Sequence, residues 1–226
     1  MDAGFEAQLH ADSVEFTQQD AALLEAVDEI GSIHKAADEL GRSYSRAHQR
    51  ITVLEEAFGG LVERQRGGSG GGGSTLTETA HDLLSRFERL RTGYSSVAET
   101  TEAVLDGTVV TRTGELGTVT TAAGDVRAIV PANTDTVQVS LRADTITLHD
   151  PDETPTESAT SARNRFDGQV LSIDHGDAIS LISVDIVAEN PLYALVTENS
   201  RERLDLEPGR HIIASFKATA TRATPK

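Results

Sequence analysis

The N-terminal part of the chain is patterned as three short helices. Apolar residues recur at intervals of three or four in three runs, and Gly31, Gly41 and Gly59 follow these runs. The runs are Leu23, Leu24, Val27 and Ile30, then Ile33, Ala36, Ala37 and Leu40, then Ala47, Ile51, Leu54 and Phe58. Thr17 and Ser43 are residue types that cap helix N-termini. Three short helices with a glycine turn between the second and third predict a helix-turn-helix.

The third predicted helix has an outer face suited to reading DNA. When Ala47 faces the core, short polar side chains point outward and basic side chains flank them, as base and phosphate contacts require. Residues 42–66 hold five arginines and three glutamates, a local basic excess in an acidic chain. The predicted DNA-binding residues are Arg42, Ser43, Tyr44, Ser45, Arg46, His48, Gln49, Arg50, Arg64 and Arg66.

A glycine-rich stretch follows the three helices. Leu61–Arg64 is a short strand pattern, residues 67–74 are glycine and serine, and Thr75–Leu76 returns to a strand pattern. An engineered linker has this composition. A β-hairpin wing with a glycine tip also has it, and the wing is favoured because strand and helix signals resume at once. We therefore predict a winged helix-turn-helix over residues 17–76, after a flexible N-terminus at 1–16.

A long helix is predicted over residues 77–105. Its apolar positions are spaced alternately by three and four residues, which is the repeat of a coiled coil. These positions are Ala80, Leu83, Phe87, Leu90, Tyr94, Val97, Thr101 and Val104. A two-chain coiled coil would make the protein a homodimer and place two recognition helices on palindromic DNA. The alternative is that this stripe packs on the protein's own domain.

From Asp106 onward the pattern changes to short alternating strands separated by turn residues. Asp106–Val109 parallels Asp167–Val170, and Ser140–Ala143 parallels Ser215–Ala218, which indicates an internal repeat. We predict a degenerate first copy at 106–150, a linker at 151–160 and an intact second copy at 161–223. The predicted fold class is α+β, with a winged helix-turn-helix, a dimerisation helix and a C-terminal region resembling a small OB-type β-barrel.

Five consecutive residues, Thr160 to Asn164, carry hydroxyls, a guanidinium and an amide. An oxyanion only accepts hydrogen bonds, so it requires such a set of donors. Lys217 supplies a second cation from the last predicted strands, in a chain with only three lysines. The alternative is a capped turn with an ordinary surface arginine. The combination favours an anion-binding site.

With Asp167–Val170, Thr197–Ser200 and Phe216–Thr219, this stretch resembles the oxyanion-binding domain called TOBE or Mop. That domain occurs in ModE-type molybdate-responsive regulators and molybdate transport ATPases. Residues 20–92 resemble the winged helix of LysR-type and ModE-type regulators. The resemblance implies molybdate or tungstate as effector, held by Ser161, Ala162, Arg163, Asn164, Thr197, Ser200, Lys217 and Ala218. It also implies that Thr197 and Ser200 come from a facing repeat.

Composition narrows the function further. The chain of 226 residues has a formal charge of −16 and no cysteine, which excludes disulfides and thiolate metal sites. Acidic excess with scarce lysine is typical of a saline cell interior. The histidines lack metal-ligand spacing, and nucleophile-elbow and Walker motifs are absent, so neither an enzyme nor a transport ATPase is expected. No membrane-spanning or secretory pattern occurs, which predicts a cytoplasmic protein.

Three functions fit these features. The favoured one is a DNA-binding transcription regulator that senses molybdate or tungstate and has no covalent cofactor. The second is an oxyanion-binding or storage protein without direct DNA regulation. The third is a DNA-binding regulator whose sensor domain takes no ligand.

Overall fold

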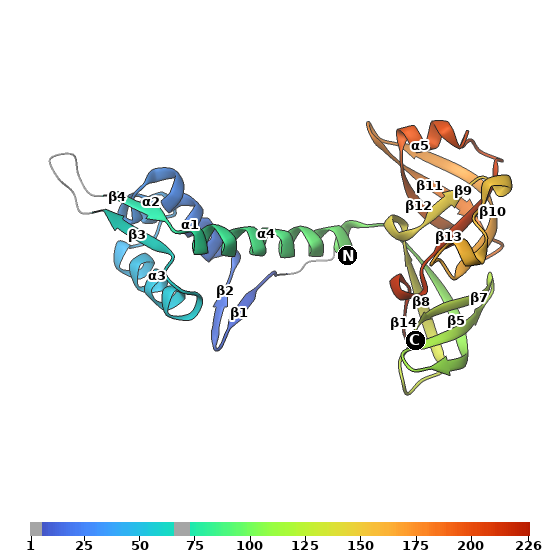
Figure 1. The fold of residues 1–226 in the computed structure, drawn as a ribbon, viewed down its shortest axis with the longest axis horizontal. Helices are drawn as coiled ribbons and strands as arrows, with labels where there is room; N and C mark the ends of the chain where they lie inside the picture. The colour runs from blue at the N-terminus through green and yellow to red at the C-terminus, as the bar shows by residue number, and fades with distance from the viewer. Residues whose placement is uncertain (1–5, 66–72) are drawn as a thin grey trace. The chain divides into compact units, whose positions relative to one another are not determined.

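The computed structural model describes residues 6–65 and 73–226, and the chain divides into two compact units, 1–99 and 100–226. Among the described residues, no helix is long and apolar enough to cross a membrane. The described part of unit 1 contains two hairpins and four helices (Figure 1). Its elements are β1 (Leu9–Ala11), β2 (Val14–Phe16), α1 (Gln18–Ile30), α2 (Ile33–Glu39), α3 (Tyr44–Phe58), β3 (Val62–Gln65), β4 (Gly73–Leu76) and α4 (Glu78–Glu99).

The predicted helix-turn-helix and its wing are confirmed. Thr17 and Asp20 form a capping box at the start of α1, and the Ser43 side chain caps α3 by accepting from the backbone N–H of Arg46. Strands β3 and β4 pair in antiparallel register from Val62–Leu76 to Gln65–Gly73, which makes the wing. The glycine tip and Arg66 lie outside the described residues.

The prediction of a flexible segment at residues 1–16 is wrong for residues 9–16. Strands β1 and β2 form a hairpin that ends at Phe16, which is fully buried. The Phe16 ring packs edge-on against Phe58 of α3 at 6.0 Å and Phe87 of α4 at 5.3 Å, between ring centroids. Each strand has only three residues, too few for alternation to be recognised in the sequence.

The predicted helix over 77–105 ends earlier, at Glu99, and β5 begins at Glu102. Val104 therefore lies on a strand, where Ala103 pairs with Leu141 inside a β-sheet. Ala80, Leu83 and Phe87 are buried in the core of unit 1, as the alternative interpretation of the apolar stripe required. Farther along, α4 extends beyond helices α1–α3 (Figure 1), and the Tyr94 side chain is 51% exposed.

Unit 2 is built from ten strands, one helix and four short 3-10 turns. The strands are β5 (Glu102–Thr113), β6 (Leu116–Thr121), β7 (Gly124–Ile129), β8 (Thr136–Arg142), β9 (Thr147–His149), β10 (Asn164–His175), β11 (Ile179–Asp185), β12 (Leu192–Thr197), β13 (His211–Phe216) and β14 (Arg222–Pro225). The helix is α5 (Glu198–Arg203), and the 3-10 turns are η1 (Ala143–Thr145), η2 (Pro151–Glu153), η3 (Glu157–Ala159) and η4 (Ala218–Ala220).

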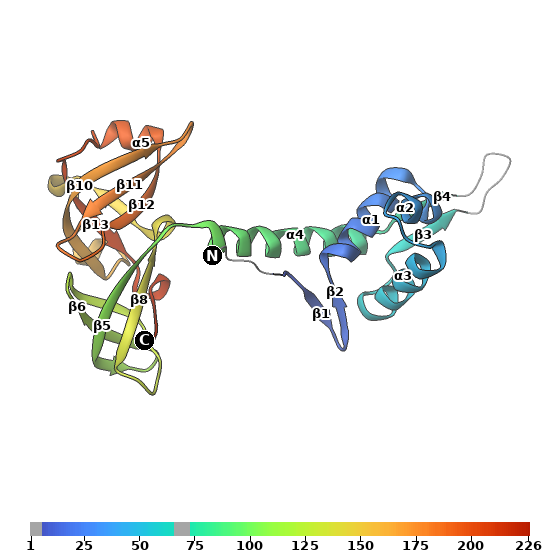
Figure 2. The same ribbon diagram turned by 180° about the vertical axis from the view of Figure 1, so that it is seen from behind.

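The two predicted repeats exchange their last strands. Strands β14, β7, β6, β5 and β8 close a barrel, in which β5 and β8 run side by side (Figure 2). The second sheet has the order β12-β11-β10-β13-β9. Thus β9 ends the first copy in sequence but pairs with β13 of the second, and β14 ends the second copy but pairs with β8 of the first. The predicted division at residues 150 and 161 therefore does not separate two independent folds.

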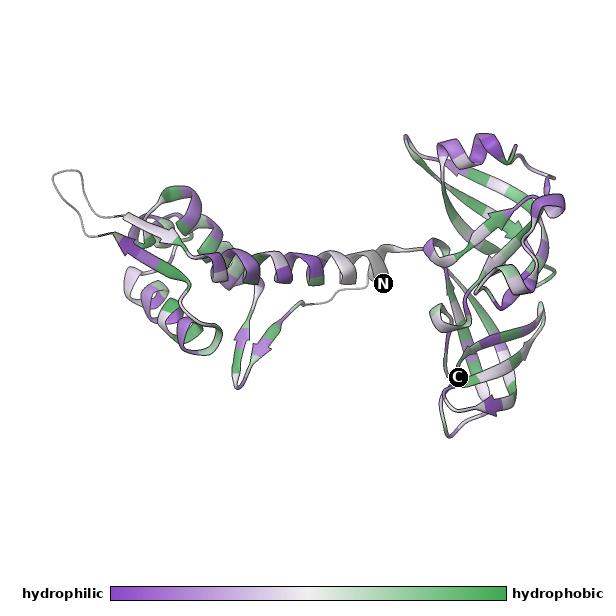
Figure 3. Ribbon diagram, in the orientation of Figure 1, coloured by the Kyte–Doolittle hydropathy of each residue, from purple (hydrophilic) through white to green (hydrophobic). Residues whose placement is uncertain are grey.

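The two predicted copies share local features of strand register. Gly107 on β5 and Gly168 on β10 each lie where an added Cβ would come within 2.5 Å of a valine methyl, that of Val119 or Val184. Two residues later, each strand has an irregularity in its pairing with the next strand. Figure 3 shows apolar segments along the strands and a hydrophilic α5, as expected when one face of each sheet packs on a core.

One ion pair joins α3 to α1. Arg50 Nε lies 2.7 Å from Asp20 Oδ1, and Arg50 Nη2 lies 2.7 Å from Asp20 Oδ2. The Asp20 side chain is 4% exposed. Burial alone would raise the pKa of Asp20, but hydrogen bonds from Arg50 and Thr17 outweigh burial and hold that pKa below its usual value. Arg50 is therefore a structural residue of the helix-turn-helix.

Replacing Arg50 with alanine leaves the buried Asp20 carboxylate without its cation. We expect Arg50→Ala to lower the free energy of unfolding of unit 1 by about 2–3 kcal/mol. Urea unfolding followed by the helical circular dichroism signal measures this loss, because most helical residues lie in unit 1. Arg46→Ala, on the exposed side of the same helix, is the control and should stay within about 0.5 kcal/mol of wild type.

The same ion pair predicts an acid dependence. Because the folded-state pKa of Asp20 is lowered, its stabilisation is present above the unfolded pKa and is lost as pH falls through the folded pKa. The stability gap between wild type and Arg50→Ala should therefore narrow below about pH 4. A gap that stays constant through that range contradicts this assignment.

The shared glycine position gives a second prediction. Gly168→Ala and Gly107→Ala should each destabilise unit 2 by about 1–3 kcal/mol, because the new methyl meets a valine side chain and a backbone carbonyl. Gly93→Ala is the control, since no atom lies within 4 Å of its added Cβ and alanine favours a helix. Thermal melts compare the three variants, and an unchanged midpoint for both strand variants would show that the sites relax freely.

Candidate functional site

A cavity of about 350 Å³ lies where β13, the loop before β10 and the η1–β9 segment meet. Its lining is rich in hydroxyl groups and contains one lysine. The lining residues are Thr145, Thr147, His149, Thr160, Ser161, Ala162, Ser215, Phe216, Lys217 and Ala220. Three of the predicted oxyanion-binding residues, Ser161, Ala162 and Lys217, therefore share one cavity.

Arg163 directly follows Ala162 of the cavity lining in the sequence, and its own side chain is not part of that lining. The antiparallel pairing of β10 with β13 begins at Asn164 opposite Phe216, and Arg163 and Lys217 flank this first pair in the sequence. The Arg163 backbone N–H donates to Phe216 O at 3.3 Å, one residue out of the register of that ladder. Both side chains are exposed. Lys217 thus lines a hydroxyl-rich cavity, and Arg163 is a second exposed cation on the loop that borders it.

The Arg163 side chain also shapes its own loop. Its Nη1 donates to Thr160 O at 2.6 Å and to Ala162 O at 3.0 Å. These bonds fold residues 160–162 around the guanidinium and orient the Ser161 segment toward the cavity. The Ala162 backbone N–H donates to the Thr160 hydroxyl at 3.2 Å.

Asn164 and Ala218 have structural roles. Asn164 is 2% exposed; its Oδ1 accepts from the Arg127 backbone N–H at 2.7 Å, and its Nδ2 donates to Arg127 O at 2.9 Å. This amide mimics a strand partner for β7 and joins the second sheet to the first barrel. Ala218 is buried at the start of η4. The side chains of both residues are thus taken up by packing or by hydrogen bonds within the protein.

Thr197 and Ser200 lie elsewhere in the same chain. Thr197 pairs with Ile179, beside the end of β10 that is remote from Asn164. Its hydroxyl accepts from the Ser200 backbone N–H at 3.2 Å and caps α5. Within one chain, the structure does not bring this hydroxyl pair to Arg163 and Lys217.

The corresponding place in the first copy has the opposite charge. Glu102 pairs with Arg142, so Glu102 occupies the position of Arg163 and Arg142 that of Lys217. Arg142 is neutralised by Asp144, with Arg142 Nε 3.0 Å from Asp144 Oδ1. The prediction that the first copy is degenerate is therefore supported by its charges, which disfavour an anion.

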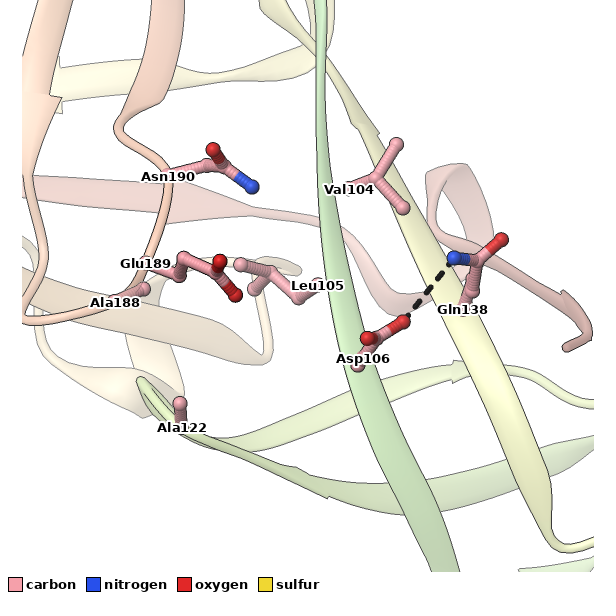
Figure 4. A pocket seen from close by; sticks show the side chains of 8 residues that line it. All are labelled: Val104, Leu105, Asp106, Ala122, Gln138, Ala188, Glu189 and Asn190. Atoms are coloured by element: carbon pink, nitrogen blue, oxygen red, sulfur yellow. Dashed lines mark hydrogen bonds between the residues drawn. The ribbon is translucent and has the colours of Figure 1, made fainter.

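A second cavity of unit 2, of about 220 Å³, also lacks the chemistry for an anion (Figure 4). Among the described residues that line it, the charged ones are Asp106 and Glu189, both acidic. Asp106 accepts a hydrogen bond from Gln138 at 3.1 Å and pairs with Lys226 at 2.6 Å. The cavity beside Lys217 is therefore the better oxyanion site.

Sequence reasoning missed four residues of that site. Thr145, Thr147 and His149 come from η1 and β9, and Ser215 comes from β13. In the sequence, His149 lacks the spacing of a metal ligand, and this pattern is typical of a surface or lightly packed residue. The alternation of polar residues at positions 145, 147 and 149 could have indicated a strand with one polar face. However, only the exchange of β9 between the two copies places that strand against β13.

The outer face of α3 forms a polar groove. Tyr44, Ser45, Gln49 and Thr52 are exposed or half-buried and line it together with His48. The aromatic ring of Tyr44 packs 5.6 Å from each of the His34 and His48 rings, between centroids. This face presents hydrogen-bonding groups of both kinds, as base-edge contacts require.

The basic residues that were predicted to contact DNA differ in how far their side chains are already engaged within the protein. Arg46 is exposed beside the groove. Arg64 of the wing lies 2.6 Å from His48 Nε2, which joins the wing to α3. Arg42 donates to Gln19 Oε1 at 3.1 Å, and Arg50 is held by Asp20. Ser43 is occupied as the helix cap. Arg46 and Arg64 are thus the better placed cations of this face.

Comparison with known proteins identifies both parts of the chain. Residues 19–81 match the family described as bacterial regulatory helix-turn-helix protein, lysR family, and residues 160–223 match the TOBE domain. The molybdenum transport protein ModE of Herbaspirillum seropedicae is 29% identical over 203 residues, which cover 88% of this chain and 60% of that protein.

Two further relatives extend this finding. The DNA-binding transcriptional dual regulator ModE of Escherichia coli (strain K12) is 26% identical over 199 residues, covering 87% of this chain and 62% of the relative. The molybdenum-pterin-binding protein MopB of Rhodobacter capsulatus is 25% identical over 231 residues, covering 88% and 86%. The chain spans about three fifths of the length of the two ModE relatives. It joins a lysR-family helix-turn-helix to a TOBE domain and is homologous to ModE proteins over most of its length.

Proposed function

We propose that this chain is a DNA-binding transcription regulator whose TOBE region senses molybdate or tungstate. The observation that carries the proposal is a hydroxyl-lined cavity that contains Lys217 and is bordered by the loop that Arg163 holds. A dianion is attracted by these two cations and accepts hydrogen bonds from the surrounding donors. The relatives named above for molybdenum and for transcription regulation support the same function.

The proposal includes a homodimer. Helix α4 carries Leu90 and Tyr94 on the continuation of its buried stripe, past the part that packs in unit 1. A second chain packed there would form the predicted coiled coil and pair two recognition helices on DNA. A second chain would also supply Thr197 and Ser200 to the cavity, since one chain alone keeps them apart.

Regulation then follows from differential binding. An oxyanion that lies between residues of two chains binds one dimer geometry better than another and shifts the dimer toward it. The spacing of the two helix-turn-helix units sets DNA affinity, so anion binding changes DNA binding. In this proposal the protein acts in the cytoplasm and has no catalytic role.

Calorimetry with molybdate, tungstate and sulfate tests the sensor. Arg163→Ala should weaken molybdate binding by about 10- to 100-fold, because a charge-assisted hydrogen bond contributes about 1.5–3 kcal/mol. Arg142→Ala is the matched control, since Arg142 occupies the equivalent site in the first copy and is paired with Asp144. We expect one anion per chain. Equal, negligible heats for wild type and both variants with all three anions would refute an oxyanion sensor.

Mobility-shift titration with the promoter DNA of its own gene tests the DNA-binding face. Arg46→Ala should weaken binding to all duplexes and lower the salt slope by about one, as loss of a phosphate contact does. Gln49→Ala should relax base preference, by about 1–3 kcal/mol at one position. The control is Arg222→Ala, an exposed arginine on β14. An Arg46→Ala protein that binds as tightly as the control argues against this surface.

A further inference from the structure

Three neighbouring strands carry one continuous polar face under the oxyanion cavity. Ser215 on β13 pairs with Thr147 of β9 on one side and with Arg165 of β10 on the other. Directly paired residues point to the same face of a sheet, so these three side chains share a face. His149 lies two residues beyond Thr147 and therefore points the same way.

His149 is bound to this face by one contact. Its Nε2 lies 2.7 Å from Ser215 Oγ, and Ser215 is 4% exposed. Both residues line the cavity that contains Ser161 and Lys217. The pair therefore forms part of the cavity wall, in the same lining as Lys217.

We propose that His149 is a positioning residue of the oxyanion site, which fixes the Ser215 hydroxyl as a donor to the anion and takes up a proton when the anion binds. This inference rests on the proposed oxyanion function. The segment that contributes His149 is the strand exchanged from the first copy, so the degenerate copy completes the site of the intact one.

The chemistry follows from the hydroxyl group. A serine hydroxyl has one hydrogen to donate and lone pairs that accept. When His149 Nε2 carries a hydrogen, that hydrogen is donated to Ser215 Oγ, and the serine hydrogen is free to point at an oxygen of the anion. When Nε2 is bare, the serine hydrogen is drawn to the imidazole and the hydroxyl presents lone pairs to the cavity. An anion therefore selects the histidine forms in which Nε2 is protonated, and the imidazolium adds positive charge.

The charges around His149 favour the neutral ring before the anion arrives. Burial lowers the pKa of His149, and the positive charge of Arg165 on β10 lowers it further. Lys217, in the same cavity, adds charge of the same sign. The adjacent carboxylate, Asp150, is paired with Arg210 near β13 at 2.7 Å. A dianion in the cavity reverses this balance and raises the pKa of His149, so a proton is bound with it.

Thermodynamic linkage between proton binding and anion binding fixes the direction of the pH dependence. Since the anion favours the protonated histidine, affinity for the anion rises as pH falls from 8 to 6. One linked proton limits the change to about tenfold per pH unit. The glutamine introduced by His149→Gln cannot titrate, but its amide is a donor to Ser215 at any pH in this range.

Calorimetry of the full chain with sodium molybdate, in buffers of different ionisation enthalpy between pH 6 and 8, measures affinity and proton uptake together. Wild type should take up a fraction of a proton per anion, and its affinity should rise several-fold toward pH 6. His149→Gln should bind molybdate with no proton uptake and a flat pH profile. His211→Gln is the control, since His211 is exposed on β13, the strand that carries Ser215, and faces Asp167 at 3.6 Å.

The outcomes separate this inference from the proposed function. If wild type and His149→Gln bind molybdate with equal proton uptake, the proposed role of His149 is wrong, but the proposed oxyanion sensor is unaffected. Absence of binding in wild type removes the sensor and this inference with it. His149→Ala distinguishes positioning from packing: it should lose affinity at every pH, whereas the glutamine variant retains the affinity that wild type has near pH 8. The proposal is contradicted if both variants bind molybdate weakly while their thermal stability and the pH dependence of their affinity stay the same as in wild type.

Discussion

The pairing of β10 with β13 is the interaction on which the proposed anion site depends. That pairing begins at Asn164 opposite Phe216, so it brings residues 160–162 and Lys217 to one cavity, whose lining holds no carboxylate among the described residues. In the proposed function, the positive charges of Lys217 and Arg163 attract a dianion to this cavity. The hydroxyls then decide how the anion is oriented. In the first copy, Glu102 beside Arg142 leaves no such excess of positive charge.

The N-terminal unit depends on a different kind of charge pair. Asp20 caps α1, receives Arg50 from α3 and is almost fully buried, so one carboxylate both starts a helix and sets the distance to the recognition helix. Glu55 has a similar role: its Oε1 accepts from the backbone N–H groups of Leu61 and Val62 and fixes where the wing departs from α3. The groove-forming residues of α3 are thereby presented on a rigid support.

Local chemistry made much of this fold predictable. Thr17, Ser43 and Gly31 mark helix ends in the sequence because capping involves residues a few positions apart. Arg163 and Lys217 were singled out by donor-rich motifs, and the resemblance to ModE-type proteins implied an oxyanion as the ligand that is proposed for them. Features that depend on distant pairing were missed. Nothing near Thr101 shows that Val104 will meet Ser140, and nothing near His149 shows that it will meet Ser215. A basic residue on a helix edge looks the same whether it faces DNA or, like Arg50, a buried aspartate.

The reciprocal placement of β9 and β14 has a consequence for how unit 2 evolves. Each half lacks a strand that only the other half provides, so neither copy can be lost, duplicated or transplanted without opening the sheet of its neighbour. A substitution that weakens β9 or β14 therefore disturbs the sheet of the opposite copy, so the two copies are constrained to change together.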